Sequence, residues 1–313
     1  MRRIVTAFAC AVTVSTALAQ QDPQFTQYMF DRLSINPGSA GTNGNMCLTA
    51  LLRQQWTGFD GAPKTGLLNF QMPINAIHSG VGLSVYLDQL GQQKNTLARL
   101  SYAYHVRLQG GISTLGIGLY AGMTSRSLGN NWISVDPVSS DEAIPDNGAS
   151  ATGFDLGLGI YYTSPTLYAG ISSTQLPQTE LGDVSIKNAR HYYVLAGYNW
   201  NIRQGSDKFV LQPSALVKSD GASTQLDISA SLLYNRMVWL GVSFRTEDAI
   251  APFIGFQRQA ANGKWSWKIG YSYDVTTSQL KNYSSGSHEI MLNYCFKIVK
   301  PPKVFEYHHP FFL

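Results

Sequence analysis

The stretch Val81-Gly82-Leu83-Ser84-Val85-Tyr86-Leu87-Asp88 decides the fold of this chain. Aliphatic residues occupy every second position, and the positions between them carry glycine, serine, tyrosine and aspartate. A period of two is the spacing of a β-strand, in which successive side chains point to opposite faces of a sheet. The stretch therefore predicts a strand with one apolar face and one polar face of low charge.

The same alternation recurs along the chain, at 97–108, 154–162, 238–245 and 265–274 among other places. Counting such runs gives about fourteen strands, and an even number is usual in bacterial barrels. Most are long enough for a tilted strand to cross a bilayer. The expected strands are 46–57, 65–73, 80–89, 95–108, 112–123, 151–162, 166–174, 191–202, 208–217, 222–234, 237–246, 249–258, 264–275 and 287–298.

Composition leaves two all-β classes open. Charged residues make up 13% of the chain, about half of the usual ~25%, while the hydrophobic share is an ordinary 44%. A secreted β-sandwich and a membrane β-barrel both alternate in this way. The polar faces of the strands are rich in glycine and serine and poor in charge, which suits a crowded lumen better than bulk solvent. We therefore expect a transmembrane antiparallel up-and-down β-barrel, with outer-membrane lipid against its apolar face.

The N-terminus predicts secretion. Arg2 and Arg3 precede an apolar run, and Ala17-Leu18-Ala19 is a small-x-small cleavage site, so 1–19 is interpreted as a signal peptide. Its removal lowers the formal charge from +4 to +2, because 1–19 holds two arginines and no acidic residue. This bias is too weak to indicate nucleic acid as a partner.

Connection lengths predict the orientation in the membrane. If the chain enters the barrel from the periplasm, the short turns 109–111, 163–165, 235–236 and 262–263 face the periplasm. The two longest connections, 124–150 and 175–190, then face outward, which is the usual asymmetry of outer-membrane barrels. We accordingly expect a barrel over 46–298 in the cell outer membrane, with both termini periplasmic.

No pattern in the sequence predicts catalysis. Four Gly-x-Ser runs lack the second glycine of a nucleophile elbow. Histidines are isolated apart from His308-His309, and no cysteine and histidine spacing resembles a zinc site. We expect neither an enzymatic activity nor a cofactor nor a metal.

Two cysteines remain after signal removal, Cys47 in the first expected strand and Cys295 in the last. A closed barrel pairs these strands, and alternation turns both residues inward near the periplasmic end. A disulfide across the closure seam is one alternative, in an oxidising compartment. The other is two unpaired small apolar residues, which is favoured because shear between the strands could hold the sulfurs apart.

Charged residues on the polar faces form a mixed set. The favoured interpretation is that they pair with one another and close a narrow lumen. The alternative is a path for ions or solutes, although no ring of one sign occurs. The set is Arg53, Asp88, Arg99, Arg107, Asp155, Asp227, Arg245, Lys268, Asp274 and Glu289.

The two ends of the chain are aromatic and lie outside the strand pattern. Residues 20–45 show roughly helical spacing broken by Pro37-Gly38, and could plug the lumen, lie on the rim or dock a partner. The tail 299–313 contains three prolines, which suit a docking peptide. The candidate partner contacts are Phe25, Tyr28, Met29, Phe30, Phe305, Tyr307, Phe311 and Phe312.

Three runs in the first part of the chain carry a family resemblance: Asp22-Pro-Gln-Phe-Thr-Gln-Tyr-Met-Phe30, Ile35-Asn-Pro-Gly-Ser-Ala-Gly41, and Arg53-Gln-Gln-Trp56 followed by Asp60-Gly-Ala-Pro63. The chain resembles the PorP/SprF family of the type IX secretion system. Leu167-Tyr-Ala-Gly-Ile-Ser172 extends the likeness. Asp31-Arg32 and Gly38-Ser39 depart from the residues that many relatives carry there.

The resemblance implies an outer-membrane subunit needed to export proteins with C-terminal sorting domains, or to hold surface adhesins, in a system associated with gliding motility. Its implied partners are the periplasmic ring lipoprotein complex and the secreted cargo. The rivals are a FadL-like channel for hydrophobic solutes, which also uses fourteen strands and an N-terminal plug, and a general porin.

Overall fold

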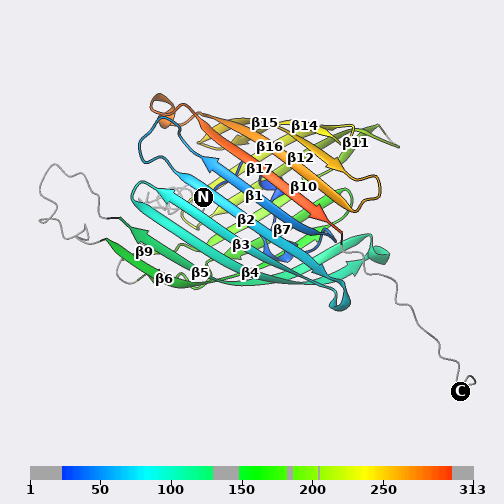
Figure 1. Ribbon diagram of the computed structural model, residues 1–313, viewed down its shortest axis with the longest axis horizontal. Coiled ribbons are helices and arrows are strands. Elements are labelled where there is room, and N and C mark those ends of the chain that lie inside the picture. The colour runs from blue at the N-terminus through cyan, green and yellow to red at the C-terminus, as the bar shows by residue number, and fades with distance from the viewer. Residues whose placement is uncertain (1–22, 130–147, 182–185, 204, 298–313) are drawn as a thin grey trace, which may run out of the picture.

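The computed structural model describes residues 23–129, 148–181, 186–203 and 205–297. Within this part of the chain, fourteen strands close into an antiparallel barrel. Consecutive strands pair around the wall, and β1 closes on β17, which lies beside it in Figure 1. None of the described helical segments is long and apolar enough to cross a bilayer.

The barrel strands lie close to the expected ranges. They are β1 (Met46–Gln54), β2 (Lys64–Ile74), β3 (Ser79–Leu90), β4 (Gln93–Leu108), β5 (Ser113–Leu128), β6 (Ala149–Thr163), β7 (Leu167–Thr174), β10 (His191–Tyr198), β12 (Ser206–Ser219), β13 (Thr224–Tyr234), β14 (Val238–Arg245), β15 (Ala249–Gln259), β16 (Trp265–Thr276) and β17 (Ser287–Phe296).

Three further strands lie outside the closed wall. β11 (Trp200–Arg203) follows β10 after Asn199 and pairs with β12 alone. β8 (Glu180–Leu181) and β9 (Ile186–Lys187) form a separate ladder in the connection between β7 and β10. Single 3₁₀ turns occur at η1 (Tyr28–Phe30), η2 (Pro37–Ser39), η3 (Asn75–Ile77), η4 (Gln109–Gly111) and η7 (Gln279–Asn282).

Side-chain alternation follows the prediction on both faces of the wall. In β6, Phe154, Leu156 and Leu158 are exposed on the outer surface. Asp155 between them is buried, and Trp239 of β14 is likewise turned inward and buried. The outward aliphatic band is therefore the lipid-facing surface, and the polar faces line the lumen.

The two mouths of the barrel differ. We call the mouth with the short connections, such as those at η3 and η4, the turn mouth, and the opposite one, which includes residues 55–63 and 277–286, the loop mouth. The expected turns at 109–111, 163–165, 235–236 and 262–263 all lie at the turn mouth. β1 starts at the turn mouth and β17 ends there, side by side in register.

Candidate functional site: a segment threaded through the lumen

The most distinctive feature is residues 23–45, which we call the lumen segment. It lies inside the barrel and has no strand of its own. At one end, Gln24 hydrogen-bonds Gln225 in the loop-mouth end of β13. At the other, the Ala40 carbonyl lies 2.8 Å from His105 Nε2 near the turn mouth, shortly before β1 begins. The segment therefore crosses the lumen from the loop mouth to the turn mouth.

The path also places the two ends of the described chain relative to the barrel. The described chain starts at Pro23, which lines the loop mouth beside Gln24, and its last strand ends at the turn mouth. The two ends of the described chain are thus at opposite mouths. The prediction that both termini are periplasmic concerns residues outside the described part of the chain and stays a prediction.

The loop-mouth half of the lumen segment is held by buried charges. The Glu289 carboxylate accepts hydrogen bonds from the backbone N–H groups of Thr26 at 2.7 Å and Gln27 at 2.8 Å. The Thr26 hydroxyl donates to Asp274 at 2.9 Å. Hydrogen bonds to charged groups are stronger than neutral ones. Two carboxylates of the wall therefore anchor the backbone and side chain of one turn of the segment.

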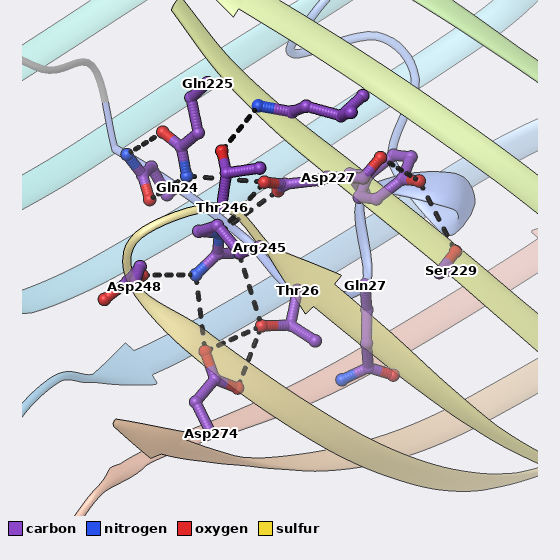
Figure 2. Close-up of polar contacts among 12 residues, drawn as sticks. Gln24, Thr26, Gln27, Gln225, Asp227, Ser229, Arg245, Thr246, Asp248 and Asp274 are labelled. Carbon is purple, nitrogen blue, oxygen red and sulfur yellow. Dashed lines mark hydrogen bonds and ion pairs between the residues drawn. The ribbon is translucent and has the colours of Figure 1, made fainter. Parts of the chain in front are cut away.

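Two arginines balance these carboxylates. Arg53 lies 2.6 Å from Asp274 and 3.0 Å from Glu289. Arg245 contacts Asp227 through Nε at 3.1 Å, and Asp248 at 3.0 Å and Asp274 at 3.4 Å through one terminal nitrogen. Figure 2 shows Arg245 between the three aspartates, with Thr26 beside Asp274. The cluster joins strands β1, β13, β14, β16 and β17 to the lumen segment.

The middle of the segment is aromatic. Tyr28 is 2% exposed, and its hydroxyl lies 3.1 Å from Ser214 of β12. Phe30 packs against Trp239 of β14 with ring centroids 4.9 Å apart. On the opposite wall, Arg99 pairs with Asp155 at 2.8 Å and lies over the ring of Tyr120. Apolar and paired polar groups thus fill the lumen at this level.

The turn-mouth half is held by backbone contacts. Asn36 donates to the Ile160 and Ile171 carbonyls at 2.9 and 3.0 Å, and its side-chain oxygen caps Gly38. A Cβ at Gly116 of β5 would overlap the Gly38 carbonyl oxygen, and one at Gly80 of β3 would overlap that of Ala40. The wall glycines therefore form a track along which the backbone of the segment packs.

The structure assigns different outcomes to the predicted site residues. Phe25, Tyr28 and Met29 are buried in the lumen, and their role as partner contacts stays a prediction. Their apolar surface finds its cover inside the barrel. Phe30 is partly buried and packs on the same cluster. Phe305, Tyr307, Phe311 and Phe312 lie outside the described residues.

Cys47 and Cys295 face each other in the β1–β17 register and are joined by a disulfide. The favoured alternative of two unpaired thiols was therefore wrong, because the strands pair without a shear that separates these positions. The same seam carries Arg53 opposite Glu289 near the loop mouth. A covalent bond and an ion pair thus fasten its two ends.

Most of the predicted lumen charges pair as expected: Arg53, Arg99 and Arg245 each contact a carboxylate. Two of the set differ. Arg107 is exposed at the turn-mouth end of β4. Lys268 lines a cavity at the turn mouth, and no ion pair of the described chain includes it.

Sequence reasoning missed the contacts of Arg32 and Asn36. Arg32 donates to the Tyr161 hydroxyl at 2.7 Å and lies 3.8 Å above the Tyr168 ring. A signal for the site of Asn36 was present in Gly116, Gly118 and Gly159 of two neighbouring strands, where an added Cβ would meet residues 36–38.

A closed barrel with a lipid-facing band and a filled polar lumen defines an outer-membrane β-barrel protein. Residues 17–294 match the family model described as the type IX secretion system membrane protein PorP/SprF. The chain belongs to this family. No curated protein matches it in sequence.

Several solved structures are similar to this chain at low sequence identity. The CymD monoaromatic hydrocarbon channel is 13% identical with a TM-score of 0.53, over 86% of this chain and 92% of CymD. A FadL homologue of Pseudomonas aeruginosa is 10% identical with a TM-score of 0.46, over 81% and 89%. Omp33 of Acinetobacter baumannii is 10% identical with a TM-score of 0.42, over 81% and 98%. The likeness to CymD shows a common fold alone.

Proposed function

We propose that this protein is a non-enzymatic subunit of the type IX secretion system that supports the export or surface attachment of proteins with C-terminal sorting domains. The family match over 17–294 carries the proposal, because it spans the lumen segment and the barrel up to the last two residues of β17. In this role the barrel is a closed platform in the outer membrane, with the turn mouth toward the periplasm. Its partners are the periplasmic ring lipoprotein complex and the secreted cargo.

The filled lumen favours the interpretation of the barrel as a closed platform rather than as an open pore. The lumen segment is tied to the wall at both mouths by side-chain and backbone contacts. Such a barrel has little use as a general porin, which needs a water-filled channel. It offers instead a rigid body whose mouths and connections can hold other components.

Deletion of the gene tests the secretion role. We expect sorting-domain proteins to be lost from the medium and cell surface and to accumulate in the periplasm, while outer-membrane proteins without such domains keep their levels. Wild-type chain supplied in trans should restore export. Normal export of all sorting-domain cargo from the deletion strain would contradict the proposal.

The C-terminal tail is the proposed contact with the periplasmic complex. Removal of 299–313 should lower co-purification of the ring lipoproteins while the barrel still inserts. A matched control replaces Lys300 and Lys303 by Gln, which keeps the tail aromatics. An unchanged lipoprotein yield after the deletion would exclude tail docking and leave the secretion role untouched.

A channel for hydrophobic solutes is the second candidate, favoured by the fold that the chain shares with CymD. Liposome swelling and single-channel recording of the purified barrel separate the two. The platform predicts negligible conductance of the wild-type barrel. Steady solute flux together with undisturbed secretion in the deletion strain would establish the channel instead.

A further inference from the structure

A cavity of about 340 Å³ lies between the lumen segment and the wall at the turn mouth. Met29, Phe30 and Arg32 of the segment line one side, and Lys268 of β16 and Asn293 of β17 line another. Asn43, which is exposed, lines it as well, so the cavity opens at this mouth. Its size is within the range of small-molecule sites.

Its two cations lack a carboxylate. The Lys268 ammonium lies 5.2 Å from the centre of the Phe30 ring. The Arg32 guanidinium contacts the Tyr161 hydroxyl, the Tyr168 ring and the Met29 carbonyl. Neither occurs in an ion pair of the described chain.

The rest of the lumen follows the opposite rule. Arg53, Arg99 and Arg245 are buried, and each has a carboxylate within 3.1 Å. By contrast, no aspartate or glutamate is among the described residues that line the turn-mouth cavity. Two cations that line one cavity without a carboxylate leave their charge without an opposite charge, which favours an anion from outside the protein.

The remaining lining suits an anion with an apolar part. Gln71 and Asn293 can donate amide hydrogens, while Phe30 and Tyr198 offer ring surface. We propose that this cavity is a binding site for a small anionic ligand, a carboxylate or phosphate carried on a compact apolar or aromatic group, which enters from the turn mouth. The proposal does not depend on the secretion role.

Binding of N-acetyl-L-phenylalanine to the purified full-length barrel tests the site. Titrations by calorimetry or ligand-observed NMR in low-chloride detergent buffer compare this carboxylate with its neutral amide, N-acetyl-L-phenylalaninamide. We expect at least tenfold tighter binding of the carboxylate. Equal binding of the two compounds, or no binding of the carboxylate, would overturn the proposal without any variant being needed.

Lys268→Gln locates the site. It should weaken binding of the carboxylate at least tenfold, whereas Lys264→Gln, an exposed lysine at the same mouth, should leave it unchanged. Unchanged affinity in a folded Lys268→Gln barrel would also overturn the proposal. Inorganic phosphate then identifies the class of anion. If phosphate competes with N-acetyl-L-phenylalanine, the site accepts anions in general; if it does not, the site is specific for carboxylates on aromatic groups.

Discussion

The two halves of the lumen hold one continuous segment by different physical means. Toward the loop mouth, buried carboxylates and arginines bind Thr26 and Gln27. Toward the turn mouth, the backbone of the segment packs on wall glycines, and the only cations at the cavity lack carboxylates among the described residues. In the loop half the buried arginines are paired with carboxylates, and the turn half is fixed by shape.

The two halves therefore differ in whether the groups that hold the segment could also bind a ligand. In the loop half, Arg53 and Arg245 form ion pairs with carboxylates of the protein itself. A glycine track fixes the backbone and leaves side chains such as Lys268 beside an open cavity. The seam between β1 and β17 repeats the contrast, with an ion pair near the loop mouth and a disulfide near the turn mouth.

The largest expected effect comes from Arg53→Met. The change leaves Glu289 without its arginine, and Asp274 keeps Arg245, at 3.4 Å, as its cation. Removal of one partner of a buried ion pair costs about 3–5 kcal/mol. We expect the thermal unfolding midpoint of the barrel to fall and residues 23–30 to become open to protease.

Arg236→Met is the matched control. Its ion pair with Asp207 is exposed, with 68% and 40% of the two side chains accessible. Such pairs contribute about 0–1 kcal/mol. If both variants lose the same stability, the buried cluster does not anchor the lumen segment as described.

Loss of the disulfide should have the next largest effect. The bond joins positions 248 residues apart in sequence. A native disulfide typically contributes about 2–4 kcal/mol, mainly by restricting the unfolded chain. We expect Cys47→Ser with Cys295→Ser to lower the unfolding midpoint, and a reducing agent to do the same to the wild-type barrel alone. A reducing agent that also destabilised the double variant would assign the effect to something other than this bond.

The wall could be predicted from sequence, and the interior only in part. Alternation at 265–274 defines a strand because lipid and lumen demand opposite side chains, and β16 is Trp265–Thr276. The lumen segment does not contact lipid on one face, so its sequence carries no such alternation. Its aromatic residues required cover, but their spacing says nothing of the direction in which the chain crosses the barrel.

Three-dimensional register explains the other outcomes. Whether Cys47 meets Cys295 depends on the shear of the closed sheet, which no local pattern encodes. Pairing among lumen charges was expected as a set, and Arg53 follows it. Lys268 does not, because it lies nearer the turn mouth than the buried carboxylates. This position along the lumen cannot be deduced from a local sequence pattern.

A smaller effect is expected from Gly116→Ala. The added methyl group would overlap the Gly38 carbonyl oxygen, so residues 36–40 must shift. Overpacking costs about 1–3 kcal/mol. We expect a modest fall in the unfolding midpoint together with a rise in ion conductance. Gly66→Ala is the control, since its Cβ would have ordinary contact at 3.6 Å with Leu52 on the outer surface. Equal behaviour of the two variants would show that the glycine track does not hold the segment.

The smallest effect on stability, close to none, should come from short epitope tags, which instead test the direction of the segment. Gln24 is bonded to Gln225 near the loop mouth, and only three residues separate Pro23 from the expected cleavage site. If the loop mouth faces outward, antibody on intact cells should label a tag placed after Gln20 as well as one at 220–223. A tag at 235–236 in the turn mouth should stay unlabelled until the outer membrane is opened. In the path described, the lumen segment starts at the loop mouth, where residues 220–223 also lie. Labelling at 220–223 without labelling after Gln20 would therefore contradict the direction in which the segment crosses the lumen.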